Sequence, residues 1–103
     1  MKIAFDIDDT LLLHNVEAHN GVFVPTGETI PNYELIQVLK WFRKNGNDIY
    51  FWSAGGQDYC ETMVKRLGLQ NDGKVIEKKM NSGIDICFDD QEVMLAEVNI
   101  QVK

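Results

Sequence analysis

Three aspartates and a threonine stand together near the amino terminus, in the order Asp6, Asp8, Asp9 and Thr10. They follow the short apolar segment 3–5, which is typical of a buried strand in a parallel sheet. Open α/β sheets form their ligand crevice at the carboxyl ends of such strands, so we expect Asp6 and Asp8 to line it. Crowded carboxylates repel one another unless a hard cation neutralises them. The pattern therefore indicates a bound metal, and phosphoryl transfer as the chemistry.

Two further apolar runs end in polar side chains in the same way. One ends at Ser53 and leads into the flexible loop 54–56, and the other ends in the adjacent carboxylates Asp89 and Asp90. Because parallel strands bring their carboxyl ends to one edge of a sheet, these side chains are expected to meet Asp6 there.

The three strand ends, in this order, resemble the motifs of the haloacid dehalogenase-like superfamily, most of whose members are magnesium-dependent phosphohydrolases. The resemblance implies that Asp6 is the nucleophile and becomes an aspartyl phosphate. It implies that Asp8 protonates the leaving oxygen and later activates water, while Thr10 helps to fix the loop. Ser53 would hydrogen-bond a phosphoryl oxygen. The residues expected to contact the substrate are Ser53, Ala54, Gly55 and a lysine.

The same resemblance implies a Mg²⁺ site. Asp6 and the backbone carbonyl of Asp8 would supply ligands together with Asp89, which is expected to bind the metal directly. Asp90 is expected to bind the metal through a water molecule, or to contact the direct ligands rather than the metal itself.

The lysine that offsets charge on the phosphate lies between the second and fourth motifs of this family, where Lys74, Lys78 and Lys79 compete. Lys78 and Lys79 follow the apolar pair 75–76, which predicts a small strand aimed at the same edge of the sheet. Lys74 lies in the turn 71–74 and is the weakest candidate. We favour Lys79 and keep Lys78 as the alternate, since a compact ammonium supplies charge without a fixed fork geometry.

The chain of 103 residues fits one small domain, residues 1–103, and neither gap between motifs can hold a cap domain. The segment 11–30 predicts a short helical turn and a β-hairpin, with a strand at 22–24 and turn residues 25–27 at the tip.

Helical periodicity marks two segments. The first has Pro31 at its opening position and ends at 45–46, and the second spans about 57–67. A last strand is expected at 98–102. Strands that alternate with helices predict a parallel sheet with right-handed crossovers and the first strand at its centre. The expected fold is α/β, a three-layer Rossmann-like arrangement with a small parallel sheet flanked by helices, haloacid dehalogenase-like and without a cap.

The net charge of −6 and the 45% apolar content predict a globular, cytoplasmic type of protein and argue against non-specific nucleic-acid binding. No run approaches the length of a membrane span, and no signal-peptide pattern opens the chain. Cys60 and Cys87 lack metal-binding spacing and are expected to pack inside. His14 and His19 are expected at the surface or the substrate edge rather than as a metal pair.

Asp58 and Tyr59 lie just after the glycine-rich loop and are expected to contact the substrate, because loops at the carboxyl ends of strands carry specificity.

Two hypotheses remain at this stage. The first is an active phosphomonoester phosphatase, with a small phosphorylated substrate favoured, a nucleic-acid end as a further fit, and an oligomer that borrows a lid from a neighbour as one option. The alternative is a catalytically silent module that binds metal or phosphate, or regulates. The open lysine assignment and the missing cap favour the module, whereas the paired carboxylates Asp6 and Asp8 favour the enzyme.

Overall fold

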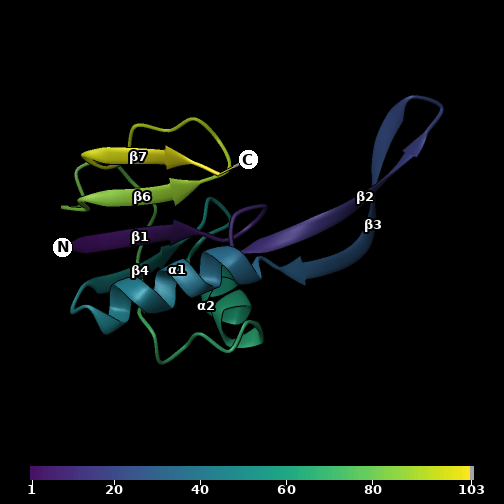
Figure 1. The fold of residues 1–103 in the computed structure, drawn as a ribbon. Coiled ribbons are helices and arrows are strands. Elements are labelled where there is room, and N and C mark those ends of the chain that lie inside the picture. The colour runs from purple at the N-terminus through teal and green to yellow at the C-terminus, as the bar shows by residue number, and fades with distance from the viewer. Residues whose placement is uncertain (103) are drawn as a thin grey trace.

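The computed structural model describes residues 1–102 (Figure 1). In chain order the elements are β1 (Lys2–Asp6), β2 (Leu12–His19), β3 (Val22–Pro31), α1 (Tyr33–Lys44), β4 (Asp48–Trp52), α2 (Gln57–Arg66), β5 (Lys74–Val75), β6 (Ile86–Asp89) and β7 (Val98–Gln101).

Five strands form one parallel sheet in the order β5-β4-β1-β6-β7, which confirms the central place predicted for the first strand. The predicted strand after residue 97 is present as β7. Phe5 stands in register with Phe51 of β4 on one side and with Phe88 of β6 on the other. Because all strands run the same way, the segments that leave their carboxyl ends start from a common edge of the sheet.

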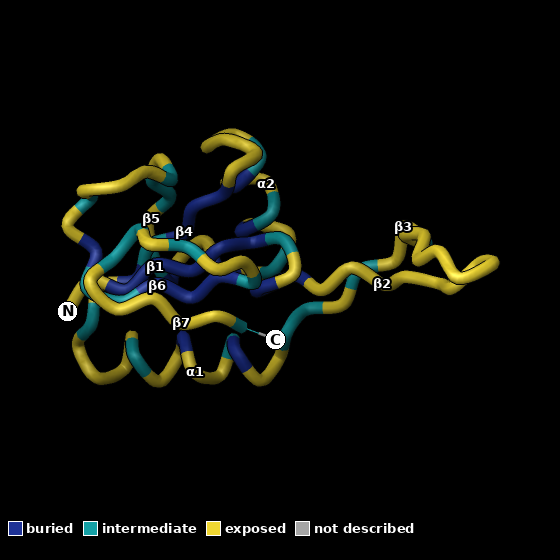
Figure 2. Tube along the Cα trace, turned by 90° about the horizontal axis from the view of Figure 1, so that it is seen from above, coloured by how far each residue is buried: buried dark blue, intermediate teal, exposed yellow. Residues whose placement is uncertain are grey.

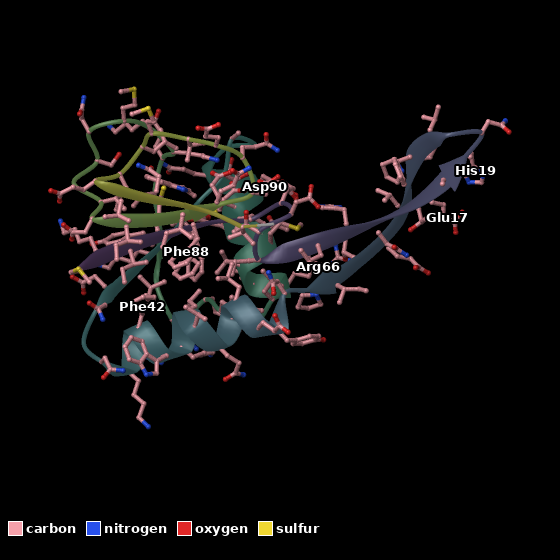
Figure 3. All side chains as sticks on the ribbon, turned by 45° about the horizontal axis from the view of Figure 1, so that its top comes forward. Glu17, His19, Phe42, Arg66, Phe88 and Asp90 are labelled. Atoms are coloured by element: carbon pink, nitrogen blue, oxygen red, sulfur yellow. The ribbon has the colours of Figure 1, made fainter. Side chains whose placement is uncertain are left out.

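The face of the sheet that carries Phe5 holds the larger core cluster. Phe5 and Phe88 stack with ring centroids 4.8 Å apart, and Phe42 of α1 lies 6.2 Å from Phe88, on the side of the sheet that faces α1 (Figure 3). Both helices contribute to this cluster, through Leu35, Leu39, Cys60 and Val64. Burial of these apolar side chains is what fixes the helices against the strands.

The opposite face of the sheet is covered by loops. Its cluster centres on Trp52 and Cys87, and apart from Tyr50 of β4 the partly buried residues packed against it come from the loop segments 76–85 and 90–97. Within residues 1–102 no helix packs there. The predicted parallel sheet flanked by helices is present, but loops rather than helices form the third layer. The crossovers β1-α1-β4 and β4-α2-β5 progress in one direction across the sheet and place both helices on the same side.

The β2–β3 hairpin projects away from the body of the domain and is exposed along most of its length (Figures 1 and 2). Its tip is Asn20-Gly21, with φ values of 52° and 80°, as a two-residue type I′ turn requires. The prediction that 25–27 form the tip is wrong. Those residues lie inside β3, opposite a register shift between His14 and Val16 of β2.

Helix α1 begins two residues later than predicted, at Tyr33 instead of Pro31. Pro31 ends β3 rather than opening the helix, and Asn32 is the N-cap, with its Oδ1 accepting a hydrogen bond from the Leu35 N–H at 3.2 Å. The Asn32 amide also donates to the carbonyl of Thr10 at 2.9 Å, which ties the helix start to the loop after β1. The predicted stop at 45–46 is confirmed, with Gly46 at φ 85°.

Both cysteines are buried and unpaired by disulfide, as predicted. Within residues 1–102, neither helix has the length and apolar character that crossing a bilayer demands.

We expect Phe5→Ala to lower the free energy of unfolding by about 3–5 kcal/mol, because it removes a fully buried ring from the centre of the sheet. The matched control is Phe23→Ala on the hairpin, where the side chain is 73% exposed and the change should stay within about 0.5 kcal/mol. Urea unfolding followed by circular dichroism measures both. Equal losses would mean that the hairpin is covered in solution.

Candidate functional site

Polar side chains from separate strand ends gather at the carboxyl edge of the sheet. Asp6 closes β1, Asp89 closes β6, and Ser53 follows β4, whose last residue is in register with Asp6. All three are buried, with exposed fractions of 6% or less. Burying charged or polar groups is unfavourable unless they are paired or bind a ligand, so this edge is the strongest candidate for function.

Asp6, Asp89 and Asp90 form a cluster in which one carboxylate oxygen of each lies within 4.8 Å of the others; we call these three residues the carboxylate cluster. Thr10 Oγ1 donates to Asp6 Oδ2 at 3.1 Å and lies 3.5 Å from Asp90 Oδ1. The backbone N–H of Gln91 donates to Asp89 Oδ1 at 2.9 Å. Three converging carboxylates with fixed rotations can hold a hard divalent cation.

Lys78 is the lysine that reaches the carboxylate cluster. Its Nζ lies 2.6 Å from Asp89 Oδ2 and 3.1 Å from Asp6 Oδ1. Burial alone lowers the pKa of Lys78, but the hydrogen bond to Asp89 and the charge of Asp6 outweigh it and hold the pKa above 10.5. The side chain is therefore a fixed positive charge at neutral pH.

Lys79, which the sequence favoured, does not reach the carboxylate cluster, and the alternate Lys78 does. The Lys79 side chain is 61% exposed and pairs only loosely with Glu77, at 3.8 Å, whereas that of Lys78 is 15% exposed. Successive side chains in an extended segment point to opposite sides, so a shift of one residue exchanges the inward lysine for the outward one. Lys74 opens β5 and is exposed.

Asp6 titrates abnormally in this setting. Burial raises the pKa of Asp6 from 3.8 to about 6; Lys78 acts against this rise, and the neighbouring charge of Asp89 adds to it. Lys78 thus offsets the effect of burial only in part, and a divalent cation would favour the ionised form of Asp6 further.

Asp8 lies on the tight turn that leaves β1. The N–H groups of Leu11 and Leu12 both donate to the carbonyl of Ile7 at 3.0 Å, and Asp9 has φ 59°. This turn precedes the segment 11–30 in which a helical turn was predicted, and β2 already begins at Leu12. The Asp8 side chain is 41% exposed, in contrast to buried Asp6.

The partners of Asp8 are residues that the sequence did not assign to it. Tyr59 donates its hydroxyl to Asp8 Oδ1 at 2.6 Å, and His14 Nε2 lies 2.8 Å from the same oxygen. Burial and the hydrogen bond to Asp8 raise the pKa of Tyr59 to about 12, so its hydroxyl keeps its proton. The sequence predicts that Tyr59 contacts the substrate. It gives no sign of the contact with Asp8, which arises from the way α2 packs beside the turn after β1.

The loop after β4 is compact. The Gly55 N–H donates to Ser53 Oγ at 3.0 Å, and the Gly56 N–H donates to the Ser53 carbonyl at 3.1 Å. Gly56 has φ 98°, which suits glycine, and α2 starts at the next residue. Ala54 and Gly55 are exposed beside buried Ser53, so their backbone N–H groups border the same edge of the sheet.

No family model matches the chain, and no curated protein or solved structure is significantly similar to it. The fold and the site define an α/β domain with a carboxylate–lysine cluster at the carboxyl ends of its parallel strands.

The raised pKa of Asp6 predicts a pH effect on the metal-free domain. The unfolded carboxyl ionises near pH 4 and the folded one near pH 6, so between these values the unfolded chain binds fewer protons and the unfolding free energy falls as pH rises. Asp6→Asn should lack this fall. Its free energy of unfolding should therefore rise by on the order of 2 kcal/mol relative to that of wild type between pH 4 and pH 6. Chemical unfolding in a chelator at a series of pH values measures it. Parallel pH profiles of the unfolding free energy in wild type and Asp6→Asn would show that the pKa of Asp6 is not raised in the folded state.

Proposed function

We propose that the protein is a magnesium-dependent phosphomonoester phosphatase of the haloacid dehalogenase-like type, without a cap domain, and that it works through an aspartyl phosphate. The observation that carries the proposal is the contact of Lys78 with both Asp6 and Asp89 at the carboxyl edge of a parallel sheet. Asp6 is thereby a buried carboxylate that is paired with a cation and belongs to a cluster of three carboxylates that could hold a metal ion.

The donor set fits Mg²⁺. Asp6 and Asp89 would bind the ion together with the backbone carbonyl of Asp8, and Asp90 would act through a water. The raised pKa of Asp6 is consistent with this fit, because burial disfavours the ionised form, Lys78 offsets that effect only in part, and a bound cation would favour the carboxylate. When bound, Mg²⁺ would neutralise charge on the transferring phosphoryl group.

Asp6 attacks phosphorus while the bond from phosphorus to the leaving oxygen breaks, and Asp8 gives its proton to that oxygen. The Thr10 hydroxyl holds one oxygen of Asp6 and thereby fixes the rotation of the nucleophile. In the second step a water gives its proton to Asp8 and attacks the phosphoryl group, so phosphate leaves and Asp6 returns to its first state.

Lys78 and Ser53 would hold the phosphoryl oxygens. Lys78 already lies between the nucleophile and Asp89, and Ser53 Oγ, which accepts from Gly55, still has its own hydrogen to donate. The backbone N–H of Ala54 would add to this anion site, whereas that of Gly55 already donates to Ser53 Oγ.

A small phosphate ester suits the site best. The β2–β3 hairpin extends outward from the body of the domain (Figures 1 and 2), so it sets no limit on the size of the substrate, and the preference rests on charge. The net charge of −6 disfavours a long polyanion such as a nucleic acid.

The first test is release of p-nitrophenol from p-nitrophenyl phosphate. Wild type should turn over with Mg²⁺ and stop with a chelator, and Asp6→Asn should abolish turnover while remaining folded, because the amide cannot form the acyl phosphate. A module that binds without turnover would release no product from any phosphate ester while still binding Mg²⁺ by calorimetry. That result, or full activity of Asp6→Asn, would overturn the proposal.

The two neighbouring lysines give a matched pair for a second test. Lys78→Met should lower kcat/KM by at least about 100-fold, since it removes the charge beside the nucleophile, whereas Lys79→Met should leave it nearly unchanged. Circular dichroism controls for folding. The reverse order of effects would show that Lys79, not Lys78, serves the phosphate.

A further inference from the structure

The geometry points to Tyr59 and His14 as positioning residues that hold Asp8 in the orientation needed to protonate the leaving group, an inference that rests on the proposed phosphatase function. Neither residue belongs to the strand ends that form the carboxylate cluster. Tyr59 comes from α2 and His14 from β2 of the projecting hairpin.

Asp8 needs such support from outside its own turn. Its side chain is 41% exposed and lies on a turn whose next residue, Asp9, has φ 59°. An exposed carboxylate on a turn samples several rotamers, whereas proton transfer requires its oxygen within hydrogen-bond distance of the leaving group. Asp6, by contrast, is buried and held by Thr10 and Lys78.

The two contacts converge on one oxygen of Asp8. The Tyr59 hydroxyl lies 2.6 Å and His14 Nε2 lies 2.8 Å from Oδ1, and within residues 1–102 Oδ2 accepts no hydrogen bond. Because the Tyr59 hydroxyl donates to Oδ1, Oδ2 is the oxygen left free to deliver the proton of the neutral carboxyl. The pair therefore fixes both the rotation of Asp8 and the oxygen that delivers its proton.

Each positioning residue is itself anchored. The backbone N–H of His14 donates to Asp9 Oδ1 at 3.2 Å, which holds the start of the hairpin to the turn. The Tyr59 ring lies against Gly55, where a Cβ would come within 2.9 Å of ring atom Cδ2. Tyr59 thereby links the loop of Ser53 to Asp8, so the phosphate-binding loop and the proton donor keep a fixed spacing.

Leaving-group dependence distinguishes a proton donor from a merely structural residue. p-Nitrophenolate is a weak base and leaves without much protonation, whereas the alkoxide of glycerol 2-phosphate must be protonated as the bond to phosphorus breaks. Loss of Asp8 positioning should therefore penalise glycerol 2-phosphate selectively. The ratio of kcat/KM for the two esters reports the first chemical step and is insensitive to a uniform loss of active enzyme.

The experiment compares wild type with Tyr59→Phe, His14→Leu and His14→Gln on both esters with Mg²⁺. Tyr59→Phe and His14→Leu should each lower kcat/KM for glycerol 2-phosphate about tenfold, with less than about a twofold change on p-nitrophenyl phosphate. His14→Gln retains an N–H donor and should recover part of the loss. Asp8→Asn sets the limit of the effect.

The matched controls are Tyr33→Phe and His19→Leu, since Tyr33 is exposed on α1 and His19 lies near the hairpin tip, far from Asp90 (Figure 3). Both should behave as wild type. Equal losses on the two esters in Tyr59→Phe and His14→Leu, or no loss, would overturn the inference while the phosphatase proposal stands. A wild type inactive on both esters would overturn the phosphatase proposal itself.

Discussion

The contact of Lys78 with Asp6 and Asp89 is the interaction on which the functional edge of this protein depends. It places one ammonium among three carboxylates at the end of a parallel sheet, in a region where burial makes every uncompensated charge costly. Lys78 lowers that cost without cancelling it, and the pKa of Asp6 remains raised. The remaining cost is chiefly that of burying Asp6 away from water, to which the charge of Asp89 adds.

That core lies on one face of the sheet. Phe5 and Phe88 stack at its centre, and both helices pack their apolar residues over them, so β1 and β6 are held side by side with their terminal carboxylates adjacent. The other face is closed by loops, and one of these carries Lys78 into the site. Packing on one face thus fixes the carboxylates, and the loop layer on the other supplies the cation.

Much of this was readable from local sequence. Apolar runs ending at Asp6, Ser53 and Asp89 predicted strands whose ends meet, and the sheet order agrees. Two predictions were wrong, the tip of the hairpin and the first residue of α1. Asn20-Gly21 forms the tip because its positive φ values suit a type I′ turn, whose twist matches that of the flanking strands. Helix α1 begins after Asn32 rather than at Pro31, because the Asn32 side chain caps it.

The sequence by itself determined the strands, their polar ends and the presence of a lysine near them, because hydrophobic periodicity and residue type act over a few neighbouring residues. The tertiary structure alone decided which lysine points inward and which side chains hold Asp8. The first depends on how an irregular loop orients two consecutive residues: Lys78 faces the site and Lys79 faces solvent. The second joins a hairpin and a helix to the turn after β1, through contacts between residues as far apart as Asp8 and Tyr59. Local pattern carries no information about such distances, since they are set by how the elements pack.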